Sequence, residues 1–381
     1  MTKIHPLLDR EKQIKAKQYE KEKRVIGLFG LILSFFILLA FYYSGLSAWL
    51  AQLFPRKHVL WVILVYVLVF QVVLAFAGFP VSFYSGYLHE HKWKFSNQTL
   101  KSWLWEQMKS FCVGLCVFSL LLGLLFWLWA FYPQGWWWMA GLVMAAVSVI
   151  FATLFPVVIF PLFNKYTPIE EKELTDSLEK TLEKGGLKSS GFFMEDMSRQ
   201  TKKENAFLAG LGRTRRVILG DNLLKNMSFA ETESIIAHEV GHYRHKHFWK
   251  QITAGTVQQL AVFFLLNILM GKYFLSFLES PRANLVLFPI FVLMFGGISG
   301  LLFNPLSNWL SRHFERQADW YALAAIPNPE AFSTALAGLA DRNLSNAYPV
   351  WWVKLLFYSH PPIGERLLIA DQWKRGGKRS S

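Results

Sequence analysis

Long apolar runs without charge alternate with polar stretches of varied length along this chain of 381 residues. Each run is long enough to cross roughly 30 Å of hydrocarbon as a helix, because a helix rises about 1.5 Å per residue. None of the runs contains Asp, Glu, Lys or Arg. The pattern therefore predicts six transmembrane helices. They cover residues 25–50, 59–79, 111–132, 136–160, 252–270 and 285–303.

A polar insert, residues 164–250, lies between the fourth and fifth runs and has the pattern of a soluble fold. Thr167, Pro168 and Glu170 have the order of an N-cap, a proline at the first helical position and a capping-box glutamate. We therefore expect a helix that opens there, and its apolar face consists of Leu174, Leu178 and Leu182. Short apolar segments predict strands at 191–194, 205–208 and 216–219, the last two joined as a hairpin.

The predicted fold is thus a polytopic α-helical membrane protein with about six transmembrane helices and a small α+β domain inserted between spans four and five. We expect the chain to fall into five parts: a basic arm, a four-span region, the insert, a two-span region, and C-terminal helices with a basic tail. Their boundaries are 1–24, 25–163, 164–250, 251–304 and 305–381.

Composition and charge support a membrane location. The chain is 53% hydrophobic, with a formal net charge of +14. The basic residues collect in the arm, the segments beside the apolar runs and the tail, which suits anionic lipids better than nucleic acid. Several lysines follow the second run, whereas residues 133–135 carry no charge, so both termini and the insert are predicted to face the cytosol. A bacterial plasma membrane is favoured over the endoplasmic reticulum of a eukaryote.

The most specific motif is His238-Glu239-Val240-Gly241-His242. Two histidines four residues apart on a helix project from one face, so both imidazoles can reach one zinc ion while the glutamate between them faces its bound water. Ser228 and Glu231 have capping-box spacing and predict where this helix begins. The motif predicts one Zn²⁺ per chain, with His238 and His242 as ligands and Glu239 as the catalytic base.

A catalytic zinc ion needs a third protein ligand and an open position. Glu315 follows the sixth run, and Asp319 stands one helical turn after it. One carboxylate can bind the metal while the other accepts the second N–H of a ligating histidine, so we expect Glu315 as the ligand and Asp319 behind it. His245 and His247 are also near, but on a continuous helix they point away from the face of His238 and His242, and we expect them to be solvated or at the level of the lipid headgroups.

Further blocks accompany this motif from about residue 80 to residue 366. They are 83–85, 89–91 and 95–100 after the second run, 161–168 at the start of the insert, 205–207 and 216–219 in the hairpin, and 359–362 with 365–366 near the C-terminus. Together with the proposed metal ligands, this ordered set resembles the type I CAAX prenyl proteases, which are integral-membrane zinc metallopeptidases.

The resemblance implies a barrel of helices around a large chamber, with the zinc site facing it. It also implies that Asn205 and Ala206 belong to a substrate-binding edge strand and that His360 and Arg366 line the active site. His360 would stabilise the developing oxyanion, with support from Arg366. The chain departs from the family pattern in residues 198–204, and it has a short basic arm where eukaryotic members have another span.

The sequence therefore predicts a zinc metalloendopeptidase that cleaves near the C-terminus of CAAX-type or other membrane-delivered peptides, with or without a lipid tail, in contact with membrane lipids. Two alternatives stay open. One is a membrane-protein quality-control protease of the heat-shock type, with the same chemistry. The other is a transporter or scaffold with a structural zinc, although uncharged spans argue against ion transport. His360 also has a purely structural interpretation, because Pro361 and Pro362 predict the end of a helix there.

Overall fold

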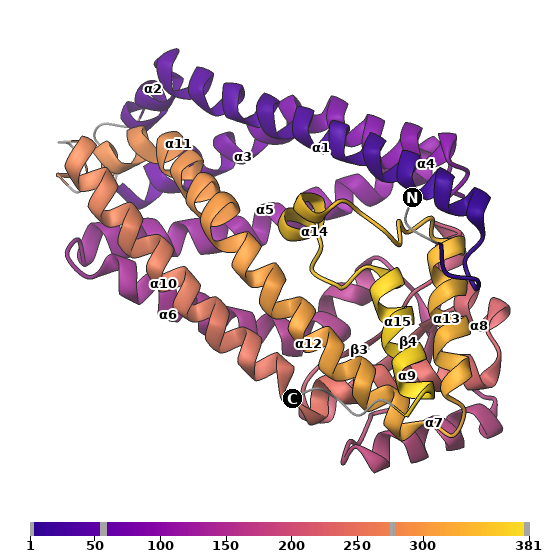
Figure 1. The fold of residues 1–381 in the computed structure, drawn as a ribbon. Coiled ribbons are helices and arrows are strands. Elements are labelled where there is room, and N and C mark those ends of the chain that lie inside the picture. The colour runs from indigo at the N-terminus through magenta and orange to yellow at the C-terminus, as the bar shows by residue number, and fades with distance from the viewer. Residues whose placement is uncertain (1–3, 54–58, 275–276, 278, 377–381) are drawn as a thin grey trace.

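The computed structural model describes residues 4–53, 59–274, 277 and 279–376. Within these residues, six helical stretches are long and apolar enough to cross a membrane, which confirms the predicted six-helix fold (Figure 1). The stretches are Arg10–Tyr43, Val59–Lys92, Leu100–Phe131, Trp136–Leu162, His247–Tyr273 and Pro281–Ala325.

Several of these stretches contain more than one element. The main membrane helices are α1 (Arg10–Tyr43), α3 (Val59–Phe83), α5 (Leu100–Phe131), α6 (Trp136–Leu154), α10 (His247–Tyr273) and α11 (Pro281–Gly297). Short helices extend or connect them: α2 (Leu46–Gln52), η1 (Tyr84–Leu88), α4 (His89–Lys92), η2 (Phe155–Ile159), η3 (Phe160–Leu162) and η6 (Ile298–Phe303). Within the sixth stretch, α11 and η6 run without interruption into α12 (Asn304–Ala325), so a membrane helix leads directly to Glu315 and Asp319.

The insert folds as a small sheet with helices, as predicted. Its strands are β1 (Tyr166–Pro168), β2 (Phe192–Glu195), β3 (Ala206–Ala209) and β4 (Arg216–Gly220), in the spatial order β1-β2-β4-β3. Its helices are α7 (Lys172–Lys184), η4 (Met197–Arg199), η5 (Gly212–Thr214), α8 (Asp221–Asn226) and α9 (Phe229–Arg244). Strands β3 and β4 form the predicted antiparallel hairpin, and β3 lies at one edge of the sheet.

The predicted start of the first helix in the insert is wrong. Residues 166–168 form β1, which pairs antiparallel with β2, and the helix α7 begins only at Lys172. The backbone N–H of Ile169 donates to Phe192 O at 3.0 Å, which prolongs the strand contact past Pro168. A proline lacks an N–H but is tolerated here, because β1 is an edge strand. Pairing with β2 therefore overrides the local helix-start signal.

Three helices follow α12 toward the C-terminus: α13 (Pro329–Arg342), α14 (Trp351–Phe357) and α15 (Ile363–Lys374). Helices α12 and α13 pack against α9, the helix that carries the two motif histidines, while α15 packs on α12 and α13, and α14 contacts α12 (Figure 1). Gly241 permits the close approach of α9 to α12, since a Cβ at this position would lie 2.9 Å from Ala318 Cα. The glycine inside the motif thus lets α9 lie directly against the helix of Glu315.

Helix α1 begins at Arg10, so residues 10–24 of the expected basic arm are its first turns. These turns dock on the C-terminal region. Gln13 is buried, donates to Asp341 Oδ1 and Ser345 O at 3.3 Å each, and accepts from Ala347 N at 3.0 Å. This contact places the start of the chain at the same end of the molecule as the insert (Figure 1).

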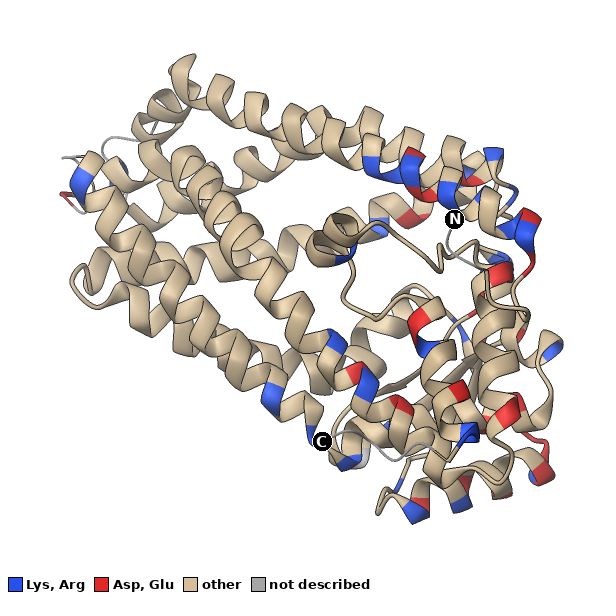
Figure 2. Cartoon of the chain, in the orientation of Figure 1, with Lys and Arg blue, Asp and Glu red and all other residues tan. Residues whose placement is uncertain are grey.

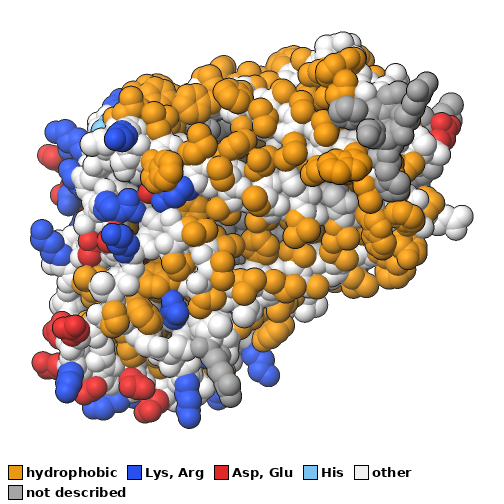
Figure 3. Space-filling model, turned by 180° about the vertical axis from the view of Figure 1, so that it is seen from behind, with side chains coloured by type: hydrophobic (Ala, Val, Ile, Leu, Met, Phe, Trp, Pro, Cys, Tyr) orange, Lys and Arg blue, Asp and Glu red, His pale blue; other side chains and the backbone are white. Residues whose placement is uncertain are grey.

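Charged residues gather at the end of the molecule that holds the insert and the C-terminal helices (Figure 2). The sides of the helix bundle instead present hydrophobic side chains over a wide band, seen in Figure 3. Phe29, Phe76, Leu120 and Leu301 are among the exposed apolar residues of the membrane helices. Apolar exposure on this scale is typical of a surface that faces lipid, so the charged end marks the membrane boundary.

Candidate active site

Three of the predicted residues meet where α9 and α12 pack together. His238 Nε2 lies 3.1 Å from His242 Nε2, and both nitrogens lie 3.2 Å from an oxygen of Glu315. His238 and Glu315 are buried, whereas His242 is half-buried. The spacing of four residues on one helix brings the imidazoles together, and the close packing at Gly241 brings the carboxylate to them.

This donor set fits a zinc ion. Four ligands at about 2.1 Å in a tetrahedron are separated by roughly 3.4 Å, close to the distances between these three residues. Glu315 Oε2 is buried, and no described residue donates it a hydrogen bond of good geometry. A buried carboxylate oxygen without a donor is costly unless it binds a cation. His238, His242 and Glu315 could therefore hold the metal while a fourth position stays open.

Asp319 and Arg366 both contact His238, one of the three proposed metal ligands. Asp319 Oδ1 is 2.9 Å from His238 Nδ1, and the Arg366 guanidinium contacts both oxygens of Asp319, with Nε at 2.9 Å from Oδ2. Burial and the Arg366 charge lower the pKa of His238, but its contacts with the carboxylates of Asp319 and Glu315 outweigh them and raise it to about 9. The surroundings of His238 thus favour a positive charge at this point, whether a proton or a metal ion.

The prediction that His247 is solvated is wrong. Helix α9 ends at Arg244, and Lys246 adopts a left-handed conformation with φ of 56° before α10 begins at His247. This break turns the chain back toward the site, so His247 is only 1% exposed and its Nδ1 lies 3.0 Å from His242 Nδ1. His245 is half-buried and stacks on the His247 ring. The prediction assumed that the helix of His242 continues through His247, and the break at Lys246 rules this out.

A cavity of about 220 Å³ opens beside the proposed metal ligands. Glu239, His360 and Arg366 line it, together with Asn205 and Ala206, so all the remaining predicted site residues border one space. The other lining residues are mainly apolar: Leu223, Ile235, Phe332, Ala335, Leu336 and Leu339. The cavity therefore combines a few polar groups with apolar walls, as expected of a site for peptide side chains.

His360 reaches this cavity from the turn before α15. Its Nε2 lies 3.3 Å from Glu315 Oε1, and its side chain is 63% exposed. Partial loss of water around the ring lowers the pKa of His360 despite the opposing charge of Glu315, which favours the neutral imidazole. Arg366 contacts Asp319 and His238, and it therefore acts on the site through a proposed metal ligand.

Strand β3 offers a free backbone edge to the cavity. Gly220 N donates to Asn205 O at 3.0 Å, and the register pairs Phe207 with Ile218, so these residues direct their backbone groups toward β4. Because bonded and non-bonded pairs alternate in an antiparallel ladder, the groups of Ala206 and Leu208 point to the open side. Among the described strands, β3 pairs only with β4.

Asn343 closes this edge just before β3. Its Oδ1 accepts from Glu204 N at 2.9 Å, and its Nδ2 donates to Glu204 O at 3.0 Å. The side-chain amide thus satisfies both backbone groups of Glu204, as a neighbouring strand would. The Glu204 carboxylate is buried and pairs with Arg342. Asn343 has no distinctive sequence signal and is not among the predicted site residues, since an asparagine at the end of a helix is ordinarily a cap.

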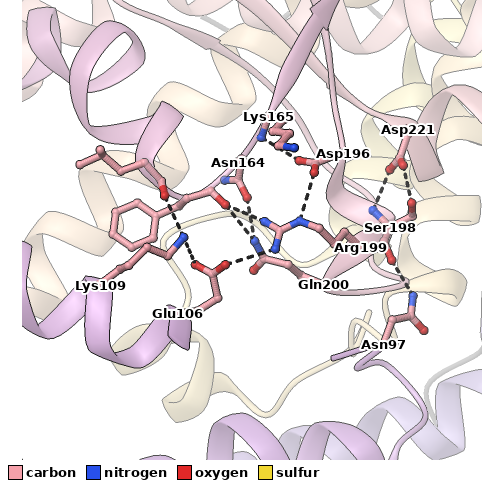
Figure 4. A network of polar contacts seen from close by, with 12 residues as sticks. Asn97, Glu106, Lys109, Asn164, Lys165, Asp196, Ser198, Arg199, Gln200 and Asp221 are labelled. Atoms are coloured by element: carbon pink, nitrogen blue, oxygen red, sulfur yellow. Dashed lines mark hydrogen bonds and ion pairs between the residues drawn. The ribbon is translucent and has the colours of Figure 1, made fainter. Parts of the chain in front are cut away.

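Polar contacts fix the segment that leads into β3 to the membrane helices (Figure 4). Arg199 Nη1 lies 3.2 Å from Glu106 Oε1 on α5, and Arg199 Nη2 donates to Phe163 O at 2.7 Å. Asn97 Nδ2 donates to Ser198 O at 2.8 Å. Residues 198–204 depart from the pattern of the family that the chain resembles. Asn97, in the block 95–100 after the second membrane stretch, helps to hold them in place.

Comparison with known proteins agrees with this geometry. Residues 168–374 match Peptidase family M48, and this range contains all the proposed metal and catalytic residues. The chain belongs to peptidase family M48. Residues 2–165 match the region described as CAAX prenyl protease N-terminal, five membrane helices. The resemblance to the CAAX prenyl proteases is thereby confirmed, and the chain is a membrane metalloprotease of this family.

Alignments with individual relatives cover nearly the whole chain. CAAX prenyl protease 1 of Saccharomyces cerevisiae is 27% identical over 406 residues, covering 97% of this chain and 89% of its own. An uncharacterized metalloprotease of Bacillus subtilis, YhfN, is 28% identical, covering 94% and 85%. The crystal structure of S. mikatae Ste24p has the same fold, with a TM-score of 0.84 at 24% identity, over 97% of this chain and 92% of that one.

Proposed function

We propose that this metalloprotease is a zinc endopeptidase that cleaves near the C-terminus of peptides delivered from the membrane. One observation carries the proposal: Ala206 of β3, Glu239, and His238 and Glu315 border the same cavity, and these last two residues cluster with His242. The cluster lies at the ends of membrane helices, because α10 begins five residues after His242. Glu315 lies on α12, which follows α11 and η6 in the sixth stretch without a break.

The proposed chemistry follows from the residues around the cavity. When bound, the zinc ion lowers the pKa of a coordinated water and polarises the scissile carbonyl. Glu239 takes a proton from the attacking water and gives it to the leaving amine nitrogen. His360, as a neutral imidazole, donates a hydrogen bond to the developing oxyanion. Asp319 and Arg366 keep His238 oriented toward the metal.

The proposed substrate is an extended chain. Such a chain can pair its backbone with the open groups of Ala206 and Leu208 while its side chains enter the cavity. A stably folded domain has no free strand to offer there. The relatives named CAAX prenyl protease support a prenylated tail, whereas the closeness of the site to the membrane helix α10 supports any apolar tail.

A substrate series tests this proposal. One cleavable sequence is presented with a prenylated cysteine, with an unmodified apolar tail, or inside a stably folded soluble protein. We expect cleavage of the first two substrates and at least about 100-fold slower cleavage of the third, because the folded segment cannot pair with β3. The measurement is the initial rate in detergent or liposomes, with product masses to locate the cleaved bond.

Each outcome of the series has a distinct meaning. Comparable cleavage of the folded protein contradicts the enclosed site. Equal rates for the two tailed substrates remove the prenyl requirement but leave the membrane protease intact. Preference for unfolded internal segments of membrane proteins would instead support the quality-control alternative.

The cytosolic position of the insert is the second part of the proposal. Lys184 at the end of α7 and Gln134 in the turn between α5 and α6 are both exposed. Single cysteines at these positions, in a chain whose Cys112 and Cys116 are replaced by serine, should react with impermeant reagents from opposite sides of sealed vesicles. Labelling of Lys184→Cys from outside the cell, or of both from one side, contradicts this topology.

A further inference from the structure

His242 has a hydrogen-bond partner that differs from the partner of His238. Both histidines turn Nε2 toward the proposed metal position, so their Nδ1 atoms point outward. Nδ1 of His238 meets the Asp319 carboxylate at 2.9 Å. Nδ1 of His242 meets Nδ1 of His247 at 3.0 Å. One ligand is therefore supported by an anion and the other by a second imidazole.

A chain of contacts continues outward from His247. Its Nε2 lies 2.9 Å from Gln317 Oε1, and Gln317 Nε2 lies 3.0 Å from His313 Nε2. The amide oxygen of Gln317 can only accept, so His247 Nε2 must carry a proton and donate it. The amide nitrogen of Gln317 can only donate, so His313 Nε2 must accept. These roles leave Nδ1 of neutral His247 as an acceptor.

The donor-to-acceptor direction of this series of hydrogen bonds agrees with metal binding at its inner end, His242. A histidine that binds a metal through Nε2 carries its remaining proton on Nδ1 and donates it to an outer partner. His242 Nδ1 then donates to His247 Nδ1, and every contact in the chain has one donor and one acceptor. An imidazole acceptor at 3.0 Å thus fixes both the tautomer and the ring orientation of His242.

Packing holds His247 in this position. Its ring stacks on Phe314 with centroids 4.5 Å apart and planes inclined by 15°, and the residue is 1% exposed. The left-handed Lys246 places it at the first position of α10. A buried ring with both nitrogens within hydrogen-bond distance of partners has little freedom to turn. His247 therefore offers His242 an acceptor of fixed direction.

We propose that His247 is a positioning residue of the metal centre: as a neutral acceptor it orients His242 and selects the tautomer that binds zinc through Nε2. This inference rests on the proposed zinc site and assigns a role to a residue outside the His-Glu-His motif. His247 is outside both the cluster of His238, His242 and Glu315 and the lining of the cavity, and it meets the cluster through its contact with His242.

The test measures zinc affinity of the full-length purified protein by competition with a chelator. His247→Phe keeps a flat ring for stacking on Phe314 but removes the acceptor, and we expect about 10- to 100-fold weaker zinc binding. His247→Gln can accept from His242 and donate to Gln317, so it should restore affinity to within about threefold of wild type, the context-dependence expected of one hydrogen bond. His245→Phe is the matched control, because it preserves the stacking on His247 and should bind zinc as wild type does.

The melting temperature of the metal-free protein distinguishes a role of His247 in zinc binding from a role limited to packing. We expect this temperature to be similar in wild type and His247→Phe, while the rise on adding zinc is smaller in the variant. Unchanged zinc affinity in His247→Phe, or an equal loss in His247→Gln, overturns the inference. His247→Leu provides the same comparison in case the phenylalanine variant does not fold.

Failure of the broader proposal gives a different result. Wild-type protein that binds no zinc at any concentration contradicts the zinc site itself, and with it the role of His247. Wild-type protein that binds zinc with unchanged affinity in the His247 variants contradicts only the positioning role. The experiment therefore distinguishes the two proposals without measuring peptidase activity.

Discussion

Glu239→Gln is expected to lower the peptidase rate by about 10²- to 10⁴-fold, the contribution of a positioned general base. The amide cannot take a proton from the attacking water, yet it keeps the size and cavity position of the glutamate. Glu239 is outside the set of His238, His242 and Glu315, so about one zinc ion per chain should remain. Metal analysis and initial rates on the same preparation measure both effects.

The matched variant for this prediction is His238→Ala. It removes a proposed ligand, so both the zinc content and the activity should fall, whereas Glu239→Gln loses activity alone. Full activity in Glu239→Gln eliminates this residue as the base. Loss of zinc in Glu239→Gln would show instead that the glutamate helps to hold the metal.

Asp319→Ala is expected to have the second large effect. Asp319 is fully buried between His238 and Arg366, and its removal leaves the Arg366 guanidinium buried without its carboxylate partner. Breaking such a buried pair costs about 3–5 kcal/mol of the free energy of unfolding. The lost contact to His238 should also weaken zinc binding by about 10- to 100-fold. Thermal unfolding and chelator competition measure the two losses separately.

A double variant separates the charge effect from the effect on the ligand. Asp319→Leu with Arg366→Met removes both buried charges, so much of the stability should return. Zinc affinity should stay low, because His238 still lacks its carboxylate acceptor. Wild-type stability in Asp319→Ala contradicts the buried ion pair as described, and recovery of zinc affinity in the double variant contradicts the orienting role of Asp319.

Local patterns predicted much of this molecule. The six apolar runs become membrane helices because their length and lack of charge depend on the segment alone. The helix of the motif begins at Ser228 with the predicted capping box, in which Ser228 and Glu231 satisfy each other. His238 and His242 share a face because their spacing matches the helical period. Each of these features is determined within a few residues of sequence.

Features that depend on distant parts of the chain could not be predicted in this way. Gln13 is buried against residues more than 300 positions away, and no local signal distinguishes it from a solvated residue of a basic arm. Pairing with β2 makes Thr167 part of a strand although the same residues resemble a helix start. Lys246 adopts a left-handed conformation that a lysine disfavours. No sequence signal therefore indicated that the chain turns there and brings His247 next to His242.

The short open edge of β3 limits how tightly backbone pairing can hold a peptide. Asn343 occupies the groups of Glu204, and the side chain of Asn205 accepts the N–H of Ala206 at 3.0 Å. The carbonyl of Ala206 and both backbone groups of Leu208 remain, and three hydrogen bonds contribute about 3 kcal/mol in total. Immobilising a freely diffusing peptide costs at least about 4 kcal/mol, so pairing alone gives no useful affinity. A tail dissolved in the bilayer would remove most of that cost, because a peptide confined to the membrane already has a high effective concentration at the site.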